Sequence, residues 1–73
     1  MKRMNELKPS ETGVVCAIKT KGSMRRRFLD LGLCEDTLVE CVGKSPGGDP
    51  SAYLIRGVVY AIRSDDCSEI FIK

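Results

Sequence analysis

The sequence of 73 residues contains no histidine and no tryptophan, and its aromatic side chains are limited to two phenylalanines and two tyrosines. Histidine is the commonest metal ligand in proteins and the most frequent general base in enzymes. Its absence removes most of the usual ways to activate a serine or cysteine nucleophile. We therefore expect neither an enzyme nor a protein with a resident metal or cofactor.

The four cysteines also lack the spacing of a metal site, because no two of them form a C-x-x-C pair. We expect free thiols, with Cys16 and Cys41 as small hydrophobic side chains of the core. Cys34 follows the end of a predicted helix, where the helix dipole is expected to raise its thiol pKa. Direct iron binding through Cys, Asp and Glu side chains is therefore only a third hypothesis.

Long apolar runs are absent as well. No stretch approaches the roughly 20 apolar residues that a membrane-spanning helix needs. Charged residues such as Lys2, Arg3 and Glu6 interrupt the N-terminus, which argues against a signal peptide. We expect a cytoplasmic protein that reaches a membrane only through a partner.

One segment has a clear helical pattern. Met24, Phe28 and Leu31 recur at i, i+4 and i+7, so they share one helix face. Ser23 suits the N-cap of such a helix, and Gly32 suits the left-handed residue that ends it. One short amphipathic helix is therefore predicted to cover a small sheet.

Three consecutive arginines, Arg25, Arg26 and Arg27, lie in the first turn of this helix. The helix dipole disfavours cations there by a few tenths of a kcal/mol each. Arg26, Arg27 and Asp30 share the polar face, and Asp30 lies one turn from both arginines. Either this face is only solvated, with ion pairs inside the helix, or it meets an acidic or phosphate-bearing partner.

The remaining apolar segments have the composition of short strands, over residues 14–18, 37–42, 51–55, 58–62 and 69–72. Arg56 and Gly57 predict a two-residue hairpin turn, and residues 64–68 fit a single helical turn capped by Ser64. Closing so small a sheet on itself removes its exposed edges. We predict one mainly β domain over residues 1–73, a small SH3-like five-stranded barrel with one α-helix inserted between strands 1 and 2.

Residues 44–50 contain two prolines and two glycines, which predicts an exposed loop. None of these glycines opens a helix, so the loop is not a phosphate-binding loop. Gly47, Gly48 and Asp49 are the second candidate for a docking surface, after the charged helix face.

Residues 24–33, with the sequence Met-Arg-Arg-Arg-Phe-Leu-Asp-Leu-Gly-Leu, resemble the helix of the FeoA family of ferrous iron transport proteins. Residues 46–50 are similar to a loop of that family, residues 56–57 to its hairpin, and residues 61–63 to the end of one strand. The order agrees over almost the whole chain. Glu35 and Asp36 replace the family's usual Pro-Gly turn, and Asp tolerates the left-handed conformation better than most residues.

This resemblance implies an SH3-like accessory domain of ferrous iron uptake, without catalytic activity. The partner in this family is the FeoB-type membrane transporter, which carries a cytoplasmic G-protein domain. We expect the contact to be one between proteins, and whether the chain also forms a homo-oligomer stays open. The partner-binding residues that we predict are Arg25, Arg26, Arg27, Asp30, Gly47, Gly48 and Asp49.

Two alternatives use the same fold differently. A nucleic-acid-binding barrel would use Lys19, Lys21 and the arginines 25–27, with Tyr53 and Tyr60 as the only candidates for base stacking. The net charge of +2 is small for that role. A regulatory domain of the metal-dependent repressor type is the other alternative, although the chain contains no helix-turn-helix or metal-binding domain.

Overall fold

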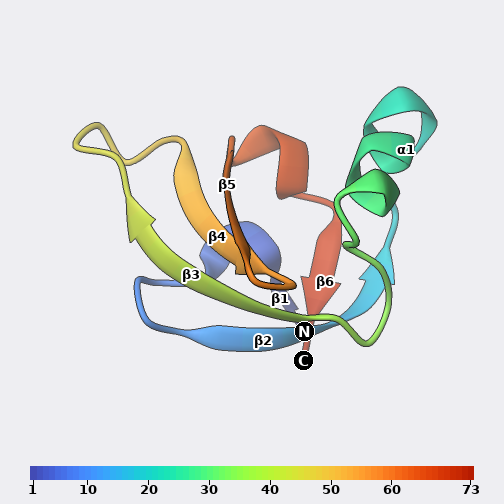
Figure 1. Ribbon diagram of the computed structural model, residues 1–73, viewed down its shortest axis with the longest axis horizontal. Helices are drawn as coiled ribbons and strands as arrows, with labels where there is room; N and C mark the ends of the chain where they lie inside the picture. The colour runs from blue at the N-terminus through green and yellow to red at the C-terminus, as the bar shows by residue number, and fades with distance from the viewer.

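The computed structural model describes residues 1–73, and its six strands form one antiparallel sheet in the order β1-β6-β2-β3-β4-β5. The helix α1 connects β2 to β3 and lies at one end of the sheet (Figure 1). The elements are β1 (Lys2–Arg3), the 3-10 helix η1 (Met4–Glu6), β2 (Thr12–Ile18), α1 (Gly22–Asp30), β3 (Leu38–Lys44), β4 (Ser51–Ile55), β5 (Val58–Ile62), the 3-10 helix η2 (Asp65–Cys67) and β6 (Ile70–Ile72).

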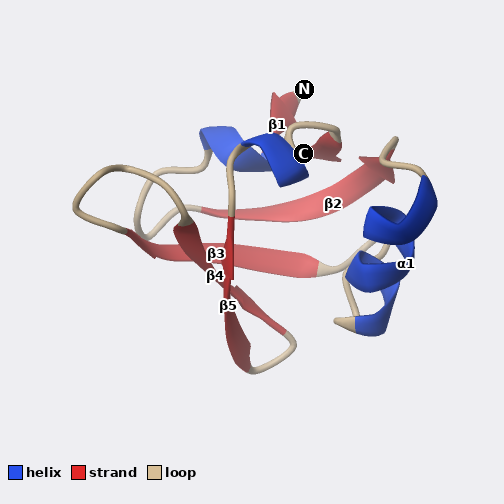
Figure 2. Cartoon of the chain, turned by 90° about the horizontal axis from the view of Figure 1, so that it is seen from above, coloured by secondary structure: helices blue, strands red, loops and turns tan.

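The strand β2 belongs to both halves of the sheet. Its residues 12–14 pair with β3, whereas residues 15–18 pair with β6, and the register shifts between Val15 and Ala17. Such an irregularity bends a strand and increases its twist. The sheet consequently curls around a single core, as the long curved paths of β2 and β3 show (Figures 1 and 2).

The SH3-like fold is therefore confirmed, but the sheet has six strands rather than the five predicted. The additional strand β1 pairs Lys2 with Ile72 and Arg3 with Phe71. The guanidinium of Arg3 also lies 5.8 Å from the centre of the Phe71 ring. Two charged residues have no apolar alternation, so their sequence contains no strand signal.

Hydrogen bonds do not close the sheet into the predicted barrel, because β1 and β5 stand at its opposite ends and do not pair. The 3-10 helix η1, which follows β1, instead contacts η2, which follows β5. The Asn5 amide in η1 donates to the Ser64 carbonyl at 3.1 Å and lies 3.2 Å from the Ser64 hydroxyl. Ser64 precedes η2 but makes no side-chain cap bond, so its predicted capping role is wrong.

The predicted helix is present, and its apolar face packs as expected, with Phe28 buried and Met24 and Leu31 against the core. Gly32 follows with a φ of +88°, which confirms the predicted left-handed end. The predicted N-cap is wrong: Gly22 takes a φ of +71° and begins the helix early, so Lys21 is the N-cap. With nine residues, α1 is the longest helix, and no helix has the length and apolar content to cross a bilayer.

The core brings together side chains from every part of the chain. Tyr53 is its largest member, and burial raises the pKa of its phenol above the ordinary value. Cys41 is fully buried as predicted, whereas Cys16 is only half-buried because it lies at the irregularity of β2. The core residues are Met4, Leu7, Val15, Phe28, Leu33, Val39, Cys41, Tyr53, Ile55, Ile62, Cys67, Ile70 and Ile72.

We predict that Phe28→Ala destabilises the protein by about 3–5 kcal/mol, because it leaves a cavity where α1 meets the sheet. Phe28 is 2% exposed, whereas its neighbour Leu29 is 45% exposed. Leu29→Ala is the matched control and should cost less than about 1 kcal/mol. Urea unfolding measures both variants, and equal losses would contradict the assignment of Phe28 as the residue that seats the helix.

Candidate functional site

The three arginines of α1 point in different directions, because successive residues of an α-helix are about 100° apart. Arg25 turns back toward β2, where its Nη1 donates to the Ile18 carbonyl oxygen at 2.8 Å. Arg26 remains at the surface, with its Nε 3.7 Å from an Asp30 carboxylate oxygen. Arg27 lines a groove between α1 and β5. The predicted cationic cluster is thus split over three sides of the helix.

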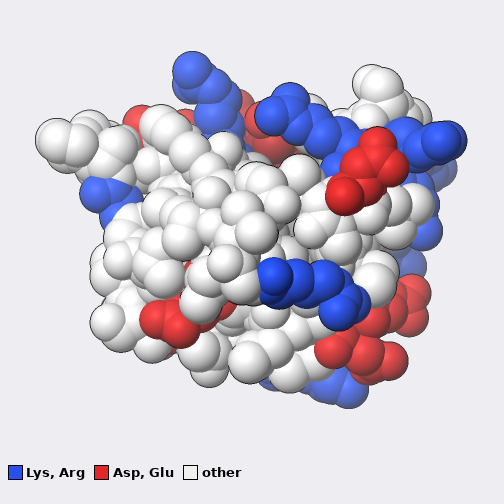
Figure 3. All heavy atoms as spheres, in the orientation of Figure 1, with Lys and Arg blue, Asp and Glu red and all other residues white.

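The pair of Arg26 and Asp30 is highly solvent-exposed. Their side chains are 81% and 70% exposed, so water and salt screen the pair and its contribution to stability is small. Both groups can therefore exchange this internal contact for one with a partner at little cost. Lysine and arginine side chains gather at this end of the molecule, over α1 and along the upper rim in the view of Figure 3.

The glycine-rich loop lies far from the charged helix. It joins β3 to β4 at the end of the sheet opposite α1 (Figure 1). Asp49 accepts a hydrogen bond of 2.8 Å from the Ser64 backbone N–H, which ties the loop to the start of η2. Gly47 and Gly48 are exposed. The structure therefore does not combine the two predicted docking surfaces into one.

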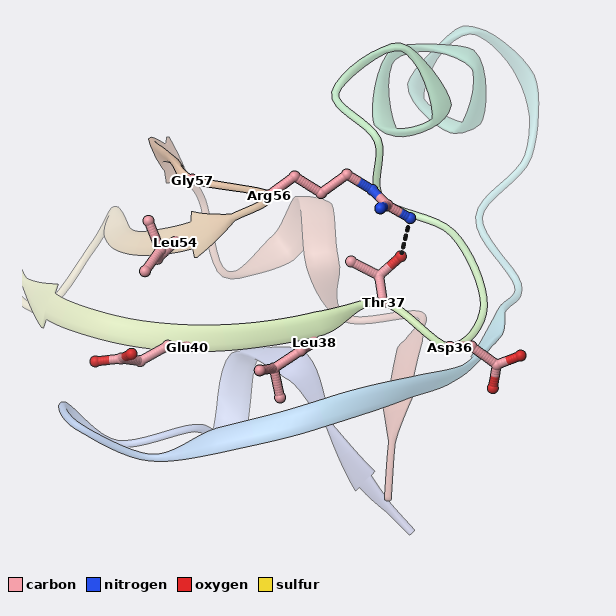
Figure 4. Close-up of a pocket in the computed structure, with 7 residues that line it drawn as sticks. All are labelled: Asp36, Thr37, Leu38, Glu40, Leu54, Arg56 and Gly57. Carbon is pink, nitrogen blue, oxygen red and sulfur yellow. Dashed lines mark hydrogen bonds between the residues drawn. The ribbon is translucent and has the colours of Figure 1, made fainter.

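Arg56, which we did not predict as a site residue, links the β4–β5 hairpin to the end of α1. Its Nε donates to the Gly32 carbonyl at 2.8 Å, and its Nη2 lies 3.3 Å from the Thr37 hydroxyl and 3.6 Å from the Cys34 sulfur. Figure 4 shows the side chain reaching from the hairpin to Thr37 across the surface. The sequence indicated only a turn here, since nothing local shows which distant groups the side chain meets.

Gly32 makes this contact sterically possible. A Cβ atom on Gly32 would lie 2.7 Å from Cδ of Arg56, and its φ of +88° already disfavours other residues. One glycine thus ends the helix and leaves room for the arginine stem. Arg56 itself has a positive φ of +49°, and with Gly57 at +84° it forms the predicted two-residue hairpin.

The Cys34 thiol lies beside this arginine. Its pKa is lowered from the ordinary value, chiefly by the hydrogen bond with the Thr37 hydroxyl and next by the Arg56 guanidinium. The expectation of a raised pKa was wrong. The helix dipole is a diffuse effect, whereas these two donors stabilise the thiolate directly.

A surface depression of about 320 Å³ lies beside Arg56, on the outer face of β3 and β4 (Figure 4). Leu38 and Leu54 line it, and Leu38 is 61% exposed. The two leucines are the only hydrophobic residues of its lining, which otherwise consists of charged and polar side chains and Gly57.

No three His, Cys, Asp or Glu side chains gather closely enough to hold a metal ion. The four cysteines are free and dispersed, and two of them, Cys41 and Cys67, are buried. The nucleic-acid alternative also loses one of its two stacking residues, since Tyr53 is only 1% exposed. What remains at the surface is a set of charged and apolar groups.

Comparison with known proteins relates this geometry to a family. A family model described as the FeoA domain matches residues 2–73. The FeoA protein of Chlorobium tepidum superposes with a TM-score of 0.90 at 25% identity, covering 97% of this chain and 68% of that one. No curated protein sequence matches at a significant level.

Two further structures share the fold at lower identity. One is Stenotrophomonas maltophilia FeoA complexed with zinc, described as a prokaryotic SH3 domain protein and a candidate ferrous iron transport activating factor. It has a TM-score of 0.88 at 22% identity, with 100% of this chain and 91% of that one covered. The other is a manganese-dependent transcriptional repressor, with a TM-score of 0.85 at 17% identity, covering 97% of this chain and 40% of the repressor.

We predict that Cys34 reacts with iodoacetamide at a lower pH in the wild-type protein than in the Arg56→Gln variant. A lowered pKa places more of the thiol in the reactive thiolate form at any pH below the ordinary thiol pKa. Loss of the guanidinium should therefore shift the pH midpoint of alkylation upward. Mass spectrometry of the peptide that contains Cys34 gives the rate, and Arg63→Gln is the control that should leave it unchanged.

Proposed function

This chain belongs to the family of FeoA domains, and from that premise we propose that it is a non-catalytic, cytoplasmic accessory protein of ferrous iron uptake. The observation that carries the proposal is the match of the family model to nearly the whole chain, residues 2–73. The Chlorobium tepidum FeoA structure, at 25% identity, supports it further. In this role the chain would offer contacts, and the chemistry of transport would belong to its partner.

The partner that we propose is the FeoB-type transporter, through its cytoplasmic G-protein domain. The exposed face of α1 supports such a contact, because Arg26 and Asp30 are held only by a screened ion pair. Arg27 is also exposed and makes no ion pair within the chain. Arg25 contributes less, since its hydrogen bond to Ile18 is part of the fold.

The loop at Gly47 and Gly48 is the second proposed contact surface. Asp49 is a weaker candidate than the glycines, because its carboxylate already accepts the Ser64 N–H. A side chain at Gly47 would meet no atom within 4 Å, so a substitution there should not disturb the fold. This loop can therefore be tested separately from α1.

A role as a regulatory domain of a larger repressor is the second candidate. Its support is the likeness to the manganese-dependent repressor, which at 17% identity is a likeness of fold. Such a domain makes contacts within its own chain. Binding of the isolated chain to a transporter domain would not be expected of it.

We predict that the purified cytoplasmic G-protein domain of a FeoB-type transporter captures this protein. The double variant Arg26→Glu and Arg27→Glu should weaken the affinity by at least about tenfold, because reversed charges repel the surface that the arginines attract. Calorimetry or biolayer interferometry measures the affinity, and added salt should weaken the wild-type complex.

Two controls accompany this test. Lys73→Glu reverses one positive charge at the C-terminal residue, away from α1. Each substitution thus changes the net charge by the same amount, and Lys73→Glu should leave the affinity unchanged. Gly47→Glu tests the loop, and a loss with this variant alone would move the contact from α1 to residues 46–49. No capture by any G-protein domain would reject the proposed partner.

A further inference from the structure

A groove lies between α1 and β5. Its volume is about 400 Å³, within the range of about 300–1,000 Å³ that is usual for ligand pockets. One wall is formed by Met24 and Phe28 of α1 and by Leu31 directly after it, and the other is residues 59–62 of β5. In Figure 1, β4 lies on one side of β5 and α1 on the other.

The backbone of β5 has unused hydrogen-bonding groups on the side of this groove. In a two-residue hairpin the pair beside the turn, here Ile55 and Val58, exchanges both backbone bonds. Alternate pairs then follow, so Val59 and Ala61 belong to the pairs that make none. Their N–H and C=O groups point away from β4, and no other hydrogen bond in the structure reaches them.

The charges of the groove are unequal. Arg27 and Arg63 line it with exposed guanidinium groups, and neither makes a hydrogen bond or ion pair through its side chain. Asp66 is the only acidic residue of the lining. A ligand with at least one carboxylate is therefore favoured over a basic one.

We propose that this groove binds an extended peptide segment of a protein partner, which adds to the sheet as a strand beside β5. Its backbone pairs with the free groups of Val59 and Ala61, and its apolar side chains pack on Met24 of α1 and on Leu31 directly after the helix. Its acidic side chains meet Arg27 and Arg63. Strand addition of this kind draws affinity from backbone bonds and specificity from alternate side chains. The inference rests on the proposed function as a docking module and specifies one of its contacts.

A second copy of this chain fits the groove less well than a single strand. Pairing of two β5 edges would bring each α1 against the other molecule, because the helix stands across the groove from the free edge. A peptide strand needs only the spacing between neighbouring strands, about 4.8 Å. The outer face around Leu38 and Leu54 offers apolar surface as well, but it has no free strand edge.

The test begins with a displayed library of random twelve-residue linear peptides, selected on the full immobilised chain. We expect enrichment of peptides in which β-branched or aromatic residues alternate with Asp or Glu. A synthetic peptide of the enriched sequence is then titrated into labelled protein. The largest shifts of the amide NMR signals should fall on Val59 and Ala61.

Three changes probe the binding mode. Ala61→Pro removes an outward N–H that β4 does not use, a substitution that edge strands tolerate, and should weaken binding about tenfold. Arg63→Glu should weaken binding about fivefold or more and reduce its salt dependence. N-methylation of alternate peptide residues tests the backbone bonds with the protein unchanged, which keeps the test decisive if the proline variant does not fold. Lys73→Glu is the matched charge control and should have no effect.

The proposal is overturned if no peptides are enriched, or if they are basic. It is equally overturned if neither peptide methylation nor Arg63→Glu changes the peptide affinity, or if the largest amide shifts fall on Leu38 and Leu54. Concentration-dependent shifts of Val59 and Ala61 without peptide would assign the groove to a second copy instead. Because the library contains no designed transporter sequence, its failure is separate from a failure of the G-protein domain to bind.

Discussion

The packing of Phe28 in the core is the contact on which the arrangement of the surface residues around α1 depends. A domain of 73 residues buries only about 60% of the surface of its unfolded chain, so one large side chain is a substantial part of its core. Phe28 fixes how α1 is rotated against the sheet. That rotation determines which of its charged residues face the sheet, the solvent and the groove beside β5.

The arginines illustrate this consequence. In sequence they form one block, yet Arg25 donates a hydrogen bond to the Ile18 carbonyl. Arg26 forms a solvent-exposed ion pair with Asp30. Arg27 lies at the groove. A run of like charges at the start of a helix is unfavourable for the helix dipole. The structure disperses the run, which lowers the mutual repulsion and gives each guanidinium a different environment.

Much of the fold follows from local patterns. The strands β4 and β5 match their predicted bounds because two apolar runs are separated by Arg56 and Gly57, both with positive φ. The helix is also where the period of its apolar residues places it. These features depend on neighbours in sequence, which a single sequence displays.

The features that sequence did not reveal depend on groups far apart in the chain. The strand β1 exists because β6 offers it an edge, and the pair Lys2–Arg3 has no pattern of its own. Arg56 meets Gly32, 24 residues earlier, and this contact changes the environment of Cys34. The groove itself arises only when β5 remains an edge and α1 stands opposite. The docking residues on α1 and the glycine loop stay predictions.

The link between Arg56 and Gly32 has a mechanical meaning. The arginine belongs to the turn that begins β5, and the glycine ends the helix on the other side of the groove. Hairpin and helix are therefore coupled at one end and cannot spread apart freely. In the proposed complex, the groove would therefore keep its width, and the peptide would lose conformational freedom on binding while the protein would lose little.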